Sequence, residues 1–425
     1  MGTNELLSGF NRAFPDGGDP RFFYAPGRVN LIGEHIDYNG GYVFPCALTL
    51  GTYAAISPRS DDTIRMVSAT IEPSVTISTN NLDFDPVHKW ANNPKGVVKL
   101  LKGMGHQIGG FDLYIWGNLP NNAGLSSSAS INVLVTLALN TVFELGLGPI
   151  EIALHAQRVE NEYMGVNCGI MDQFASAMGR KDHAILLNCG NLDYKYVPLE
   201  LGEYKLVLAN TNKRRTLADS KYNERRAECE HALSILKTVC EIENLCDLPF
   251  DDQFESLCRK AFGDSVVNNG VHGQCNIQLT DKPEITSSPE DIAYRRAYHA
   301  ISENHRVKSA TESLNKGDLA AFGTALTASH LSLKGFYEVT GYELDALALA
   351  AHEFEEEPQT NGQTRTKMLG SRMTGAGFGG CTVSIVHKDS VEDFIDKVGQ
   401  RYTQLTGLTA SFYVAATDDG AREIF

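Results

Sequence analysis

Charged side chains cluster between glycines near the start of the chain. Arg28, Glu34, His35 and Asp37 all lie within the segment Gly27–Gly41. Carboxylates accept hydrogen bonds from hydroxyl groups, whereas guanidinium and imidazole groups donate them, and glycines let a ring approach the backbone. The pattern therefore fits a polyol ligand. The alternative is a solvated turn whose charges are incidental.

A second segment, residues 118–130, is rich in small residues and is followed directly by a long apolar run. Backbone N–H groups of such a loop, together with the N-terminus of a following helix, form a cradle for phosphate. Ser127 and Ser128 would present hydroxyl groups beside that cradle, where phosphate-bound Mg²⁺ takes oxygen ligands. The chain has no G-x-x-x-x-G-K-[ST] motif, so the loop is not a Walker A loop. A serine-rich helix cap without a ligand is the alternative.

Two carboxylates in the middle of the chain are candidates for chemistry. Asp172 follows a glycine turn at the start of an expected helix, and Glu160 lies one helix earlier. Facing a pocket, Asp172 would accept a hydroxyl proton during phosphoryl transfer, and Glu160 would complete a Mg²⁺ site with Ser128. The alternatives are an N-cap for Asp172 and an ordinary surface position for Glu160.

A glycine-rich segment near the C-terminus, Gly375–Gly380, matches the dinucleotide-binding fingerprint only superficially. That fingerprint follows a strand and opens a helix, whereas these glycines precede a β-like run. The Rossmann interpretation therefore fails. Four glycines in six residues indicate a close approach of backbone or ligand, and the sequence leaves open which of the two it is.

Periodicity predicts the elements that position these segments. The expected strands are 111–116, 204–208 and 381–386, and the expected helices are 131–147, 151–163, one from 171 onward, 217–239, 289–316 and 319–330. The strand at 111–116 alternates apolar and polar residues, which is typical of a half-buried strand. Residues 268–289 form a polar excursion, and 371–380 are expected to be a loop. We place a domain boundary near residue 200.

Composition narrows the class of protein. The 425 residues are 42% hydrophobic and 21% charged, which is typical of a folded globular chain with more than one domain. A net charge of −15 argues against broad nucleic-acid binding and against adhesion to anionic membranes. Nine cysteines without a C-x-x-C pair fit reduced thiols, and no apolar run is long enough to cross a bilayer. We expect a cytoplasmic protein.

Together, these segments resemble the GHMP family of small-molecule kinases, and within it the galactokinases. The segment Gly27–Gly41 is similar to the galactokinase signature, and Gly124–Ser130 matches the family's phosphate loop. Gly169–Gln173 matches the segment with the proposed catalytic base, and Met373–Gly380 matches the third motif. All four occur in the expected order.

The resemblance implies an α+β, two-domain GHMP kinase fold. Residues 1–200 would form an N-terminal domain resembling ribosomal protein S5 domain two, and residues 201–425 a ferredoxin-like C-terminal domain. The active site would lie between them. The implied reaction is the MgATP-dependent phosphorylation of α-D-galactose at its C1 hydroxyl, which yields galactose 1-phosphate and ADP and opens the Leloir pathway.

The resemblance also implies roles for individual residues. Asp172 would lie against the C1 hydroxyl, with Arg28 steadying it and the γ-phosphate charge, and Ser128 and Glu160 would hold Mg²⁺. The residues implied to bind the sugar are Glu34, His35, Asp37, Gly169 and Tyr222. Those implied to wrap the phosphates of ATP are Asn122, Ala123, Gly124, Leu125, Ser126, Ser127, Ser128, Ala129 and Ser130.

One position departs from the family pattern. Asn122 replaces the first glycine of P-x-G-x-G-L-S-S-S-A, and Asn is the least costly substitute where the backbone needs a positive φ. We therefore expect function to survive. Two alternatives remain open: a sister kinase acting on N-acetylgalactosamine or another aldose, and a regulator that binds galactose and ATP without turnover. The sequence does not indicate an oligomeric state.

Overall fold

The computed structural model of the chain describes residues 2–120, 123–213, 218–270, 276–279, 288–356 and 366–424. Asn122, part of the expected phosphate loop, lies outside these ranges, as does most of the polar segment 268–289. The strands are β1 (Arg21–Asn30), β2 (Tyr42–Val43), β3 (Pro45–Pro58), β4 (Thr63–Ser68), β5 (Val75–Ser78), β6 (Phe111–Gly117), β7 (His183–Asn188), β8 (Tyr194–Pro198), β9 (Tyr204–Asn210), β10 (Met368–Thr374), β11 (Cys381–His387), β12 (Ser411–Ala415) and β13 (Arg422–Ile424).

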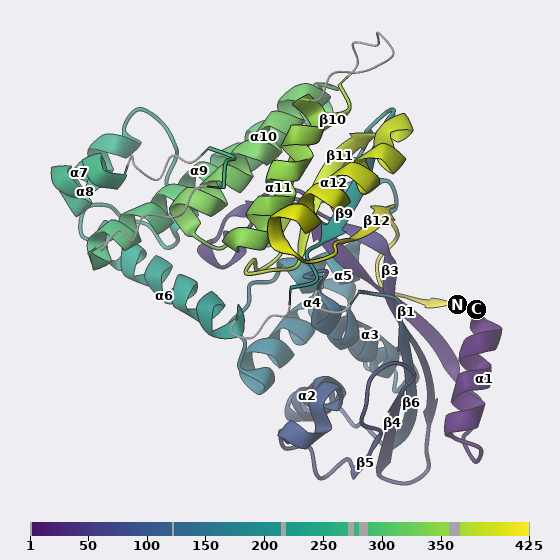
Figure 1. The fold of residues 1–425 in the computed structure, drawn as a ribbon. Coiled ribbons are helices and arrows are strands. Elements are labelled where there is room, and N and C mark those ends of the chain that lie inside the picture. The colour runs from purple at the N-terminus through teal and green to yellow at the C-terminus, as the bar shows by residue number, and fades with distance from the viewer. Residues whose placement is uncertain are drawn as a thin grey trace.

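Helices connect and cover the strands (Figure 1). They are α1 (Thr3–Ala13), α2 (Asn92–Gly103), α3 (Ser127–Val142), α4 (Pro149–Arg158), α5 (Met171–Met178), α6 (Ala218–Leu236), α7 (Phe254–Phe262), α8 (Asp264–Gly270), α9 (Pro289–Asn315), α10 (Leu319–Ser332), α11 (Gly341–Glu356) and α12 (Val391–Thr406). A π-helical turn, Val159–Met164, extends α4. Within the described ranges, none of the helices has the length and apolar character needed to cross a membrane.

The first sheet has the order β13-β1-β3-β6-β4-β5 and is covered on both faces. Ala54, Ile56, Leu113 and Ile115 pack with buried residues of α2 and α3. On the opposite face, Ala55 and Tyr114 pack against Leu6 and Phe10 of α1 and against Phe14, which follows the helix. The prediction of a half-buried strand at 111–116 was therefore wrong in its burial, because α1 covers Tyr114 while Arg59 and Arg65 pair with the buried Asp112.

The second sheet, β10-β11-β9-β12, is antiparallel and lies between two layers of side chains. Val207 and Val386 pack with α11 and α12. Leu208 and Ile385 face the largest core cluster, which combines residues from both halves of the chain. The C-terminal strand β13 returns to pair with β1 of the first sheet. The division of the chain near residue 200 stays a prediction.

The predicted elements match the structure with two shifts. The expected helix at 131–147 begins earlier, at Ser127, and ends at Val142. The expected loop at 371–380 is wrong over its first part, since Ser371–Thr374 belong to β10 and pair with β11. The sequence pattern did not predict this strand because its residues are small or polar and do not alternate with apolar ones. Its polar side chains are buried by contacts with segments far away in the sequence.

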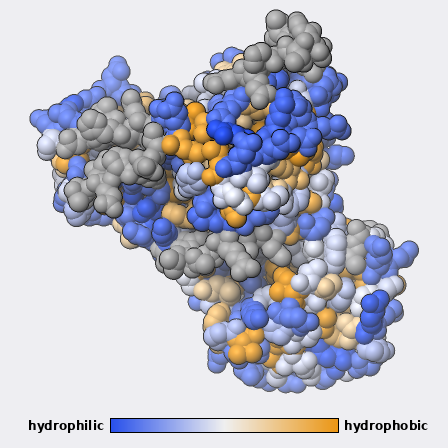
Figure 2. Space-filling view, in the orientation of Figure 1, coloured by the Kyte–Doolittle hydropathy of each residue, from blue (hydrophilic) through white to orange (hydrophobic). Residues whose placement is uncertain are grey.

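Hydrophilic residues cover most of the visible described surface in Figure 2, and hydrophobic residues form smaller groups among them. This distribution agrees with a chain in which 42% of the residues are hydrophobic and most of the largest ones are buried. The apolar material is used for packing the sheets, as expected for a globular protein.

Candidate active site

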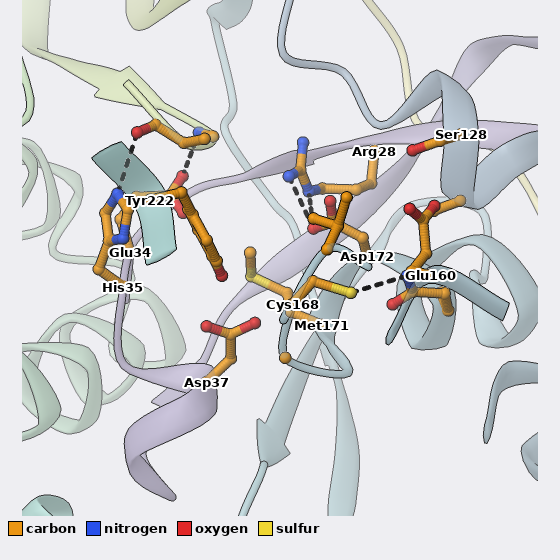
Figure 3. A pocket seen from close by; sticks show the side chains of 16 residues that line it. Arg28, Glu34, His35, Asp37, Ser128, Glu160, Cys168, Met171, Asp172 and Tyr222 are labelled. Carbon is orange, nitrogen blue, oxygen red and sulfur yellow. Dashed lines mark hydrogen bonds and ion pairs between the residues drawn. The ribbon is translucent and has the colours of Figure 1, made fainter. Parts of the chain in front are cut away.

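One pocket brings the four candidate segments together (Figure 3). Its volume is about 140 Å³. Since a cavity needs at least about 10–15 Å³ of such volume to hold one water, the pocket has room for a small polar ligand. The residues that line it are Arg28, Glu34, His35, Asp37, Ser128, Ala129, Glu160, Val166, Cys168, Gly169, Met171, Asp172, Gln173, Tyr222, Gly375 and Ala376.

Asp172 and Arg28 form an ion pair on the wall of this pocket. The Arg28 Nε and Nη2 atoms lie 2.8 and 2.6 Å from Asp172 Oδ1. The Arg28 side chain is 3% exposed, whereas that of Asp172 is 31% exposed and open to the pocket. Asp172 does not cap α5, because the N-cap residue is Ile170. Its carboxylate is thus oriented by Arg28 and remains accessible to a ligand.

The expected phosphate loop leads directly into α3. Gly124 and Ser126 have positive φ values of 71° and 63°, and Ser126 is the N-cap residue of the helix. Its side chain makes no capping hydrogen bond. The alternative of a serine-rich helix cap is therefore not what the structure shows at this residue. The turn instead aims the N-terminus of α3, with its partial positive charge, at the side of the pocket where Ser128 lies.

Glu34 is almost fully buried, and one of its oxygens is occupied by protein groups. Its Oε1 accepts hydrogen bonds from Thr374 Oγ1 at 3.0 Å and from the Gly375 backbone N–H at 2.7 Å. Thr374 and Gly375 belong to the third motif, more than 300 residues away. Glu34 therefore joins the first and third motifs through Oε1, while its side chain still lines the pocket.

His35 is held in one tautomer by its neighbours. Its Nε2 lies 3.2 Å from the carbonyl oxygen of Ala376, which can only accept, so Nε2 carries the proton. Its Nδ1 then accepts from Tyr38 Oη at 2.8 Å, and Tyr38 accepts from Tyr337 at 2.6 Å. Burial lowers the pKa of His35 to about 3, so the ring is neutral. Tyr222 lies beside it, with ring centroids 5.5 Å apart.

Asp37 and Gly169 face each other across the pocket wall. A Cβ atom added to Gly169 would lie 2.1 Å from Asp37 Oδ2, so any other residue at this position displaces the Asp37 carboxylate. Burial raises the pKa of Asp37 to about 7, and the charges of Asp172 and Glu34 act in the same direction. With Glu160, four carboxylates line the pocket and create a demand for hydrogen-bond donors, which hydroxyl groups of a ligand can meet.

Ser128 and Glu160 contribute oxygen atoms to another part of the pocket. Glu160 Oε1 accepts from Asn132 Nδ2 at 3.0 Å, which orients the carboxylate. No group of three or more His, Cys, Asp or Glu residues suited to a metal occurs in the described residues. One carboxylate and one hydroxyl group fit Mg²⁺, which typically takes one or two protein ligands and completes its shell with phosphate oxygens and water.

The glycine-rich third motif touches the phosphate loop. Gly375 and Gly377 have φ values of 83° and 80°. Added Cβ atoms would lie 2.8 Å from the Gly124 carbonyl oxygen and 2.2 Å from that of Val339. The sequence left open whether backbone or a ligand comes close to these glycines. The structure shows that backbone does so at both Gly375 and Gly377. The loop also lines the pocket through Gly375 and Ala376.

A buried charged layer behind Glu34 escaped the sequence analysis. Arg372 is fully buried, and its Nη1 donates to the carbonyl oxygens of Asn30 and Leu31 at 2.8 and 3.1 Å. Its Nη2 lies 3.5 Å from Glu34 Oε1. Glu303 of α9 accepts from the Gly33 backbone N–H at 3.0 Å. A charged residue inside a long helix looks like a surface residue in the sequence, so no local signal identified Glu303.

Family models match three parts of the chain. The galactokinase galactose-binding signature matches residues 8–58, the GHMP kinases N terminal domain matches residues 92–180, and the GHMP kinases C terminal model matches residues 310–404. These matches contain or adjoin the segments that meet in the pocket. They confirm the predicted fold class of a GHMP kinase with N- and C-terminal domains.

Full-length relatives agree with these models. The chain is 46% identical to the galactokinase of Lactiplantibacillus plantarum over 427 residues, with both chains covered completely. It is 46% identical to the galactokinase of Bacillus subtilis, covering 99% of this chain and 98% of that one. The crystal structure of Lactococcus lactis galactokinase complexed with galactose is similar, with a TM-score of 0.86 and 38% identity over 99% of this chain and 100% of that one.

Proposed function

Because the chain belongs to the galactokinase family of GHMP kinases, we propose that it transfers the γ-phosphoryl group of ATP to the C1 hydroxyl of α-D-galactose. The products are galactose 1-phosphate and ADP. The observation that carries this proposal is the accessible Asp172 carboxylate, held by buried Arg28, in a pocket next to a glycine-serine loop at a helix N-terminus.

The proposed transfer uses few protein groups. The O1 oxygen of the sugar attacks the γ-phosphorus atom, the bond to the β–γ bridging oxygen breaks, and ADP leaves with that oxygen. The proton of the O1 hydroxyl goes to Asp172, while Arg28 holds the carboxylate and balances negative charge near the γ-phosphate. Since phosphoryl transfer passes through a loose transition state, positioning and charge stabilisation supply most of the rate enhancement.

The sugar contacts follow from the same pocket. Glu34, His35 and Asp37 would bind hydroxyl groups, with Gly169 and Tyr222 shaping the wall. The His35 ring is already bonded at both nitrogens, so it contacts the sugar by sharing or exchanging one of those bonds. Glu34 is bonded through Oε1, which makes Oε2 the oxygen that we assign to the ligand.

We propose Mg²⁺ as the cofactor, held by Ser128 and Glu160 together with ATP phosphates. Bound there, Mg²⁺ would neutralise phosphate charge during transfer. The phosphate-binding residues would be those from Ala123 to Ser130, which turn from the loop into α3. The expected contribution of Asn122 stays a prediction, as does a cytoplasmic location.

A coupled ADP-release assay with several sugars tests the function. We expect turnover with galactose and much lower kcat/KM with N-acetylgalactosamine, arabinose and glucose. A preference for N-acetylgalactosamine would identify a sister kinase. Stabilisation against heat by galactose and ATP without ADP release would identify the alternative of a non-catalytic binding protein.

The raised pKa of Asp37 predicts a pH dependence. Below about pH 7 the carboxyl holds a proton in the free protein, and above it the carboxylate accepts hydrogen bonds from the sugar. We therefore expect kcat/KM for galactose to rise between about pH 6 and 8. The Asp37→Asn variant cannot ionise, so its lower kcat/KM should lack this rise. A flat wild-type profile, or an unchanged rise in the variant, would contradict the assignment.

Gly169→Ala is expected to weaken sugar binding selectively. The new Cβ collides with Asp37 Oδ2 and displaces that carboxylate, whereas the φ value of Gly169 imposes no strain on alanine. We expect KM for galactose to rise about 10-fold or more, with KM for ATP and the melting temperature nearly unchanged. Gly103→Ala, at a helical glycine with open space around its Cβ, is the control. Equal changes in both KM values would contradict a role in the sugar site.

A further inference from the structure

We propose that Ser126 is a positioning residue, which orients the Asp172 carboxylate and so couples the phosphate loop to the acceptor hydroxyl. This inference rests on the proposed function and adds to it a role for Ser126 other than phosphate binding. It stands on three features of the described residues: a short hydrogen bond, an unusual backbone conformation and the attachment of Arg28 to the same loop.

The hydrogen bond joins the loop to the reactive carboxylate. Ser126 Oγ donates to Asp172 Oδ2 at 2.5 Å. The other oxygen, Oδ1, receives both Arg28 nitrogens at 2.8 and 2.6 Å. Two different segments thus hold the two oxygens, and rotation of the carboxylate about its Cβ–Cγ bond breaks at least one contact. Oδ2 accepts only from Ser126 and keeps a second lone pair, so the carboxylate can still accept the proton of a sugar hydroxyl.

The backbone of Ser126 is arranged for this contact and not for helix capping. Its φ and ψ values of 63° and 49° lie in the left-handed region, which non-glycine residues rarely occupy. Serine is a preferred N-cap residue, but here the side chain makes no capping bond. The hydroxyl group is directed to Asp172 instead. Unfavourable conformations of this kind persist mainly where function requires them.

The same loop also holds Arg28. Arg28 Nη1 donates to the Gly124 carbonyl oxygen at 2.7 Å, and the Arg28 backbone N–H donates to that of Leu125 at 3.3 Å. Three consecutive loop residues therefore contact the Arg28–Asp172 pair. A loop that is ordered by ATP phosphates would order the carboxylate at the same time, so the base is best oriented when the phosphoryl donor is present.

The test separates the hydroxyl group from the backbone strain. Ser126→Ala removes the hydroxyl and keeps a side chain in the left-handed region, whereas Ser126→Gly removes the hydroxyl and relieves the strain. We expect both variants to lose about 10-fold or more in kcat, with KM for galactose and ATP changed less than about threefold. Thermal unfolding should show Ser126→Gly to be at least as stable as Ser126→Ala.

A double-mutant cycle then tests whether Ser126 acts through Asp172. In the Asp172→Asn background, measured under single-turnover conditions, Ser126→Ala should cost less than about twofold. Ser127→Ala is the matched control, because its neighbouring hydroxyl group belongs to the same loop and should cost the same factor in both backgrounds. The inference is overturned if Ser126→Ala costs the same factor in both backgrounds, or raises only the KM for ATP.

These outcomes are distinct from a failure of the proposed function. A wild-type protein without turnover on any sugar would refute the kinase proposal itself. If the wild type is active and the Asp172→Asn variant turns over at a nearly normal rate, Asp172 is not the general base. Only the comparison of Ser126 variants in the wild-type and Asp172→Asn backgrounds tests whether Ser126 acts through Asp172.

Discussion

We expect replacement of Asp172 with Asn to lower kcat for galactose by about 10²–10⁴-fold and to change KM for galactose by less than about threefold. The amide has nearly the shape of the carboxylate, and its oxygen can still accept from Arg28, so the pocket keeps its form. It cannot accept the proton of the O1 hydroxyl at neutral pH. The loss therefore falls on the transition state and not on sugar binding.

Initial rates from ADP release, measured at varied galactose and saturating ATP, check this expectation. Asp83→Asn is the control, because the Asp83 side chain is 89% exposed and pairs only with a surface lysine, Lys99, at 2.8 Å in the described residues. Its kinetic constants should equal those of the wild type. Retention of nearly normal turnover by Asp172→Asn would remove Asp172 from the chemistry.

Glu303→Gln is expected to have the largest effect on stability. Glu303 is fully buried and accepts from Gly33 N–H, from Ser329 Oγ at 2.5 Å and from Arg306 Nε at 2.8 Å. The variant leaves the buried guanidinium group of Arg372 without this nearby negative charge. Removal of one member of a buried charged network costs about 3–5 kcal/mol. We expect the free energy of unfolding to fall by this amount.

Urea denaturation of the variant and the wild type measures the difference. Glu312→Gln is the matched control on the same helix, since Glu312 is 72% exposed and lies 3.9 Å from Lys316. Loss of such an exposed pair costs less than about 0.5 kcal/mol. Similar losses in the two variants would show that the buried network does not stabilise the fold.

The pH dependence of this difference has a defined sign. Burial alone raises the pKa of Glu303, but its surroundings outweigh this effect and lower the pKa to about 2. The lowering comes, in decreasing order, from Arg306, His299, Arg372 and the hydrogen bond of Ser329. In the unfolded chain, the pKa is about 4.3. A depressed pKa stabilises the folded state above about pH 4.3, and this stabilisation is lost as the pH falls toward about 2. The difference between wild type and Glu303→Gln should therefore narrow below about pH 4.3.

The candidate chemistry was predictable because each motif is local. Arg28, Glu34 and Asp37 are close neighbours in the chain. The small residues of the turn before α3 are typical of a phosphate-binding loop. Helices and most strands were also predictable, because their apolar residues repeat with the period of the element. The resemblance to the GHMP family then placed Asp172 and Glu160 in the same site.

The partners of these residues were not predictable from the pattern. Thr374 and Gly375 bind Glu34 across more than 300 residues, and the Ser126 hydroxyl turns from its helix to Asp172. Burial of Glu303 depends on the packing of α9 against α10 and against the turn that follows β1. Such contacts have no sequence period, since they arise only when distant elements pack together.

The amino-acid sequence by itself determined which groups are available: carboxylates, a guanidinium group, hydroxyl groups and flexible glycines, each on an element set by local periodicity. Tertiary structure decided how those groups are used. It held both oxygens of Asp172, assigned one oxygen of Glu34 to the third motif, and placed four carboxylates in one pocket where burial raises the pKa of Asp37. The physical reason is that hydrogen bonding and electrostatics depend on distance and burial, which only the folded chain establishes.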